Sequence, residues 1–155
     1  MKHSRVALPE PSYLARIGEI AYTISSMEWT ILGDLHRLVA ALPDAFTLDR
    51  LEPEMTSGIA TKIKAATTDM TDGPTKEYLV AVYLALYAAA AIRNDVLHAR
   101  PATHPSNSQR LMRAETTNRR TTGARFWIDD EWFDEAIVKL NDLLTAINDR
   151  RPPFS

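Results

Sequence analysis

Apolar residues recur at three- and four-residue steps over long stretches of this chain, which is the pattern of amphipathic helices. The first stretch runs from Tyr13 to Leu42, and the second from about Pro53 to Met70. A third runs from about Thr75 to Ala99, and a fourth begins at Asp129 or Asp130 and ends near Asp149. The pattern therefore predicts four helices.

The third stretch is the most apolar, since every residue from Tyr78 to Ile92 is apolar or a tyrosine. A helix that spans a membrane needs about 20 such residues. This run is shorter and is bounded by charged residues on both sides. We therefore expect a buried central helix and no membrane contact.

The segment 101–125 lacks this periodicity and is rich in Ser, Thr, Asn and Pro. It predicts a long loop or a short β-hairpin, with strands at Gln109 to Thr116 and Ala124 to Ile128. The predicted fold is all-α: a small four-helix bundle in a single domain, 1–155, with this insertion between the third and fourth helices. We expect flexible tails at 1–11 and 151–155.

Composition agrees with a folded domain, because 45% of residues are hydrophobic and 25% are charged. The chain has no cysteine, which excludes disulfides, thiolate metal sites and cysteine nucleophiles and fits a reducing compartment. No signal peptide is visible among the first dozen residues. These features predict a cytoplasmic protein.

Arg93, Asn94 and His98 stand at the polar end of the third predicted helix. At about 100° per residue, Asn94 and His98 share one face, whereas Arg93 lies about 140° from His98 around the axis. Arg93 must reach around the helix or meet His98 of a second copy. A homodimer permits the second arrangement.

Glu28 lies on the apolar stripe of the first predicted helix, where an unpaired carboxylate is costly. Arg93 is its natural partner, because a guanidinium can satisfy a carboxylate at two points. Alternatively, the helix is turned so that Glu28 reaches water.

An Arg-Asn pair followed by three residues and a histidine, late in the third helix of a small four-helix domain, resembles the signature of HEPN domains, many of which are RNases. The similarity covers roughly Leu14 to His98 and the last helix. Ala99, Arg100 and Pro101 stand where such domains usually have a glycine after the histidine.

The resemblance implies a metal-independent endoribonuclease in which the ribose 2′-hydroxyl attacks its own phosphate. His98 would be the general acid or base, Arg93 would stabilise the phosphate charge, Asn94 would orient either group, and Glu28 would support Arg93. No metal and no cofactor are expected. The resemblance also implies a toxin or defence role, a homodimer and an antitoxin protein as a partner.

Six arginines and one acid lie between residues 100 and 125, so this segment carries a net charge of +5 and the remainder, given −2 overall, carries −7. A basic segment after the candidate site suits an RNA backbone. The predicted RNA-binding residues are Arg100, Arg110, Arg113, Arg119, Arg120 and Arg125. The alternative for this segment is an ordinary solvated loop.

Three other interpretations stay open. His98 alone can be a helix-terminal histidine that bonds the last carbonyls. The whole chain can be a non-catalytic HEPN-like module that dimerises or binds a nucleotide or a partner protein. It can also be a plain helical scaffold in which the Arg-Asn-His pattern is accidental.

Overall fold

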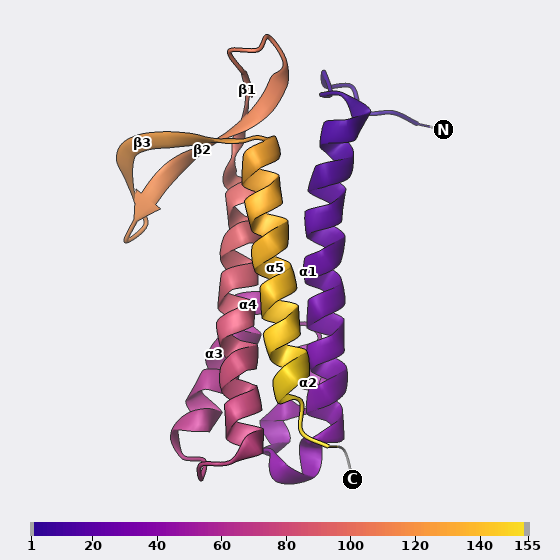
Figure 1. The fold of residues 1–155 in the computed structure, drawn as a ribbon, viewed down its shortest axis with the longest axis vertical. Helices are drawn as coiled ribbons and strands as arrows, with labels where there is room; N and C mark the ends of the chain where they lie inside the picture. The colour runs from indigo at the N-terminus through magenta and orange to yellow at the C-terminus, as the bar shows by residue number, and fades with distance from the viewer. Residues whose placement is uncertain (1, 154–155) are drawn as a thin grey trace.

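The computed structural model describes residues 2–153. Three long helices lie side by side in it, as Figure 1 shows: α1 (Pro11–Arg37), α4 (Pro74–His98) and α5 (Asp130–Arg150). Helix α3 (Thr56–Thr68) packs on α4. The short helix α2 (Leu48–Leu51) and two 3₁₀ turns, Val39–Ala41 and Asp44–Phe46, connect α1 to α3 at the lower end of the bundle.

Helix α4 is the centre of the core. It contacts α1, α3 and α5, and Tyr78, Leu79, Val82, Ala85 and Leu86 are fully buried along it. By length and composition α4 passes for a membrane-crossing helix. Its contacts with three other helices and its fully buried side chains agree with the expectation of a central helix in the bundle.

A three-stranded antiparallel sheet follows α4, so the predicted all-α class is wrong. Its strands are β1 (Arg100–Thr103), β2 (Gln109–Thr117) and β3 (Arg120–Ile128), in that order across the sheet. The predicted hairpin is present as β2 and β3. Strand β1 was missed because Pro101 was interpreted only as a helix terminator, although an edge strand tolerates proline.

The turn between β2 and β3 explains the shape of the hairpin. Asn118 and Arg119 have φ values of 51° and 63°, and two consecutive residues with positive φ make the type of turn whose twist matches paired strands. Residues 115–125 are all exposed, and the hairpin extends sideways from the bundle (Figure 1). The distal half of the hairpin is therefore an arm that stands clear of the helices.

The base of the sheet is fixed to α1 by one tyrosine. The Tyr13 hydroxyl donates a hydrogen bond to the Ile128 carbonyl at 2.6 Å and accepts one from the Leu111 backbone N–H at 2.9 Å. Burial raises the pKa of Tyr13. Because Ile128 is itself fully buried, the base of the hairpin is anchored in the core, whereas the arm is exposed.

Helix boundaries follow the predicted stretches with local differences. Helix α1 ends at Arg37, and the predicted continuation to Leu42 is a 3₁₀ turn. The predicted second helix, from about Pro53 to Met70, is present as the shorter α3, and α2 is an additional turn of helix that lies before it and was not predicted. The predicted N-terminal tail contributes to the fold, since Glu10 pairs with Arg110 of β2 at 2.5 Å.

The lower end of the bundle holds a buried polar cluster. The Tyr78 hydroxyl donates to Asp34 Oδ2 at 2.5 Å, and Arg151 Nε donates to the same oxygen at 2.8 Å. Asp34 is only 4% exposed. Burial, and then the hydrogen bond to Asp34, raises the pKa of Tyr78. Arg151, the first residue after α5, thus connects the end of the chain to α1 and α4. Residues 154–155 of the predicted C-terminal tail lie outside the described residues.

Candidate functional site

The last turns of α4 direct their polar side chains to two different sides. Asn94 and His98 are exposed on one side, and neither side chain makes a hydrogen bond within residues 2–153. Arg93 faces α1 and α3 on the other side. The structure therefore separates Arg93 from the two residues with which the sequence motif groups it.

Arg93 and Glu28 meet, as the sequence predicted, but through a third residue. Arg93 Nη1 donates to the Thr56 hydroxyl at 2.7 Å, and that hydroxyl donates to Glu28 Oε1 in a short hydrogen bond. The direct distance from Arg93 Nη1 to Glu28 Oε1 is 3.8 Å. The side chains are 27% and 24% exposed, so this is a partly buried bridge and not the two-point pair that we expected.

Thr56 was missed by the sequence analysis. It is 1% exposed at the first position of α3, where its hydroxyl has no place in an apolar core unless it is hydrogen-bonded. No pattern in the sequence marks it, because a threonine at the start of a helix is ordinary.

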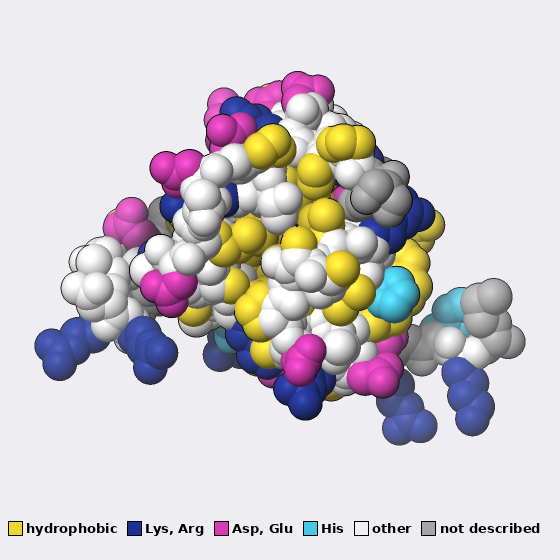
Figure 2. All heavy atoms as spheres, turned by 90° about the horizontal axis from the view of Figure 1, so that it is seen from below, with side chains coloured by type: hydrophobic (Ala, Val, Ile, Leu, Met, Phe, Trp, Pro, Cys, Tyr) yellow, Lys and Arg dark blue, Asp and Glu magenta, His cyan; other side chains and the backbone are white. Residues whose placement is uncertain are grey.

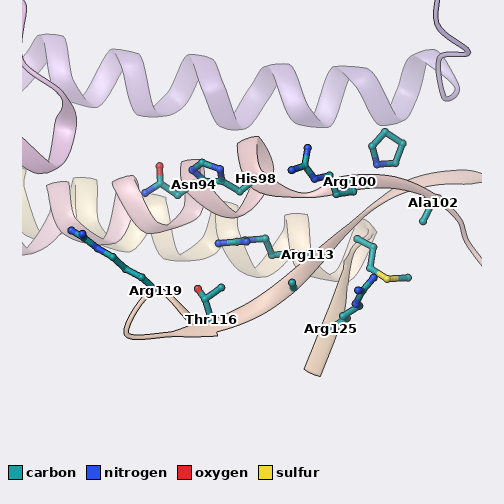
Figure 3. A pocket seen from close by; sticks show the side chains of 11 residues that line it. Asn94, His98, Arg100, Ala102, Arg113, Thr116, Arg119 and Arg125 are labelled. Carbon is teal, nitrogen blue, oxygen red and sulfur yellow. The ribbon is translucent and has the colours of Figure 1, made fainter. Parts of the chain in front are cut away.

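Asn94 and His98 open into a cavity of about 760 Å³ between the end of α4 and the sheet. We call this cavity the His98 hollow. Figure 3 shows its labelled side chains arranged along the last turns of α4, β1 and the hairpin. Its lining residues come from four elements and the hairpin turn: Asn94, His98, Arg100, Pro101, Ala102, Met112, Arg113, Ala114, Thr116, Arg119 and Arg125.

The six predicted RNA-binding arginines fall into two groups. Arg110 and Arg113 are held by ion pairs with Glu10 and Asp95, at 2.5 and 3.3 Å. The other four have no ion pair in the part of the chain that the structure describes, and three of these line the His98 hollow: Arg100, Arg119 and Arg125.

Arg120 is the fourth unpaired arginine and is exposed at the tip of the arm. Figure 2 shows basic side chains at the end of the left-hand projection, which is the hairpin of Figure 1. The arm therefore extends the positive charge of the hollow outward from the bundle.

This arrangement can bind an anion and transfer a proton. Unpaired guanidinium groups around a cavity attract phosphate oxygens, which they can contact at two points. An imidazole can act as a general acid or a general base. No group of three or more potential metal ligands is present among residues 2–153. The hollow is thus suited to a phosphate-containing ligand.

Met112 and Thr116 also line the hollow, and sequence reasoning did not select them. They lie there because β2 alternates its side chains between the two faces of the sheet. Only the strand register, which pairs Met112 with Arg100 and with Trp127, reveals this placement.

Comparisons of the chain with protein-family profiles, with curated proteins and with solved structures return no match.

Proposed function

We propose that this chain is a metal-independent endoribonuclease whose active site is the His98 hollow. One observation carries the proposal: an exposed histidine without a hydrogen bond in residues 2–153 shares a cavity with three arginines that have no ion pair there. A structural histidine at a helix end has no need of such neighbours. An acid–base group among unpaired guanidinium groups suits attack on a phosphodiester.

The proposed reaction needs only the substrate and protein side chains. A base removes the proton of the ribose 2′-hydroxyl, and its oxygen forms a bond to the adjacent phosphorus. The bond from phosphorus to the 5′-oxygen breaks, and an acid gives that oxygen a proton. The products are a 2′,3′-cyclic phosphate and a 5′-hydroxyl. His98 performs one proton transfer, Asn94 orients it, and the arginines of the hollow stabilise the charge on the phosphate.

We further propose that two copies of the chain form a homodimer in which Arg93 of one faces His98 of the other. Within one chain Arg93 does not line the hollow. Leu84, which is 54% exposed, and the exposed Ala91 lie on the side of α4 that carries His98. An apolar strip beside the site suits a self-complementary contact.

Mixing two inactive variants tests the shared site. If Arg93 acts across the dimer, Arg93→Ala and His98→Ala proteins should each be inactive, whereas refolding them together should restore about a quarter of wild-type cleavage. In the mixed dimer one site has both wild-type residues and the other has neither. If both residues act within one chain, mixing restores nothing, and the shared-site arrangement is wrong.

The activity itself is tested with purified protein and mixed RNA in EDTA. Cleavage that persists in EDTA and leaves 2′,3′-cyclic phosphate ends supports the proposal. If purified wild-type protein cleaves no RNA of any kind, the proposed ribonuclease activity is wrong. A cytoplasmic toxin or defence role, with an antitoxin protein as partner, is the cellular setting that we propose for such an enzyme.

A second candidate function is a non-catalytic module that binds RNA or a nucleotide. The bridge through Thr56 favours it, because Arg93 is engaged by its own chain on the side away from His98. The two functions differ in one measurement: the module binds RNA without cleaving it.

A further inference from the structure

A row of side chains crosses the sheet beside the His98 hollow. Arg100 of β1, Met112 of β2 and Trp127 of β3 are partners in the antiparallel register, so their side chains lie on the same face. The neighbouring residues Phe126 and Ile128 point to the opposite face and pack on the helical core. Trp127 therefore belongs to the outward face of the sheet.

Trp127 is held in place from one side. The His104 ring meets it edge to face, with 4.8 Å between the ring centroids. His104 is itself fixed by Ser106, whose hydroxyl lies 2.8 Å from His104 Nδ1 and whose backbone N–H donates to that nitrogen at 3.2 Å. The indole is only partly buried. It is thus an ordered aromatic ring with an accessible surface.

Two unpaired arginines share the outward face of the sheet with this ring. Arg125 precedes Trp127 by two residues and lies on the same face, and Arg100 lies in the same row. Both are exposed, have no ion pair in the described part of the chain, and line the His98 hollow together with Met112. Because Met112 lines the hollow and is the register partner of Trp127, the indole lies beside the edge of the hollow, on the face of the sheet that carries these arginines.

We propose that Trp127, with Arg100 and Arg125, is a base-stacking subsite for a single-stranded RNA that runs through the His98 hollow. Arginines contact the backbone of the strand, and one unpaired base stacks on the indole. Bases in a duplex are stacked on one another and cannot reach such a ring, so the subsite selects unpaired RNA. The subsite rests on the proposed function for its location, but it is a binding site and is measurable without cleavage.

Binding to an uncleavable strand tests the subsite. The probe is a fluorescein-labelled, mixed-sequence 12-nucleotide 2′-O-methyl RNA, compared with an abasic strand of equal length and with the same sequence as a duplex. Fluorescence anisotropy gives the affinities of the wild type, Trp127→Ala, Trp127→Phe and Trp127→Leu. The control is Trp29→Ala, since Trp29 is 60% exposed on α1 and does not line the hollow.

We expect Trp127→Ala to weaken binding of the base-containing strand about tenfold and to leave the abasic strand unaffected, because a stacked base contributes on this scale. Trp127→Phe should restore most of the affinity, and Trp29→Ala should bind as the wild type does. Trp127→Leu keeps the apolar contacts and removes the aromatic ring, so it decides the question if Trp127→Ala does not fold.

Equal losses for both strands, no loss for either, or tighter wild-type binding of the duplex overturns the subsite. Cleavage of the matching RNA with its 2′-hydroxyls separates the two proposals. If the wild type cleaves RNA but its Trp127 variants bind both strands as the wild type does, the result contradicts the subsite and supports the nuclease. If the wild type binds the base-containing strand more tightly than the abasic strand, this preference depends on Trp127 and no RNA is cleaved, the result contradicts the nuclease and supports the subsite.

Discussion

The two ends of the helical bundle both carry arginines and hydrogen-bonding side chains, but they differ in how these groups are partnered. At the lower end, Asp34 accepts hydrogen bonds from Tyr78 and Arg151 in a buried cluster. At the upper end, His98 and three arginines of the hollow, Arg100, Arg119 and Arg125, are exposed and have no ion pair in the described residues. The first arrangement is satisfied by its own chain, and the second is open to a ligand.

This difference separates stability from function. A polar group that is buried and fully bonded is needed to keep the fold, because losing a partner leaves a desolvated group unpaired. A cluster of exposed, like-charged groups adds nothing to the fold and repels itself. The comparison therefore predicts that substitutions in the lower cluster change stability and that substitutions in the hollow change RNA cleavage.

The largest expected effect is on catalysis. His98→Ala should lower the rate of RNA cleavage by at least about a hundredfold, because a positioned acid or base contributes on this scale. The free energy of unfolding should be unchanged, since the exposed imidazole makes no hydrogen bond in the described structure. Single-turnover cleavage and thermal unfolding measure the two quantities.

His36→Ala is the matched control, because His36 is also exposed but lies on α1 away from the hollow. It should cleave and unfold as the wild type does. Equal cleavage by His98→Ala and His36→Ala contradicts the enzyme hypothesis.

Asp34→Ala should have the largest effect on stability. The change leaves the buried Tyr78 hydroxyl without an acceptor and Arg151 without its ion pair, so we expect a loss of about 3 kcal/mol in the free energy of unfolding. Chemical denaturation measures it, with Asp142→Ala, an exposed position on α5, as control. A loss no larger than that of the control contradicts the structural role of the cluster.

The raised pKa of Tyr78 makes stability depend on pH in the alkaline range. The unfolded chain releases the tyrosine proton near pH 10, whereas the folded chain still holds it. The contribution of Tyr78 is therefore complete below about pH 10 and is lost as the pH rises above that value. Tyr78→Phe should weaken this alkaline loss, which denaturation at several pH values from neutral upward detects. Part of the alkaline loss of stability should remain in this variant, because the pKa of Tyr13 is also raised.

Glu28→Ala should have a smaller effect than the loss of one partner from a fully buried ion pair, which costs about 3 kcal/mol or more. Both side chains are about a quarter exposed and Thr56 stays bonded to Arg93, so a loss of about 1–2 kcal/mol is the expected result. Glu28→Gln keeps an acceptor for Thr56 and should lose less. Thermal denaturation that shows the same loss for both variants contradicts the bridge.

The helices and the hairpin were predictable because each leaves a periodic pattern that local residues determine. The strand β1 was not, since Pro101, which indicates the end of α4, is also the second residue of this edge strand. At the site, the spacing of Asn94 and His98 indicated a common face. The bridging role of Thr56 and the position of Trp127 beside the hollow depend on contacts between distant segments, which no local pattern encodes.

The smallest expected effect concerns the tip of the arm. Replacing Arg119 and Arg120 together with alanine should weaken binding of a single-stranded RNA and reduce the slope of log affinity against log salt by about 1.4, because about 0.7 ions are released for each neutralised phosphate. Cleavage at saturating RNA should persist, since His98 and the other arginines of the hollow are intact. Titrations at several salt concentrations measure the slope. The control is Arg50→Ala with Lys64→Ala, two exposed cations on α2 and α3 that do not line the hollow. Equal slopes for the two double variants mean that the arm does not contact the RNA, and the positive path from the hollow then ends at Arg100 and Arg125.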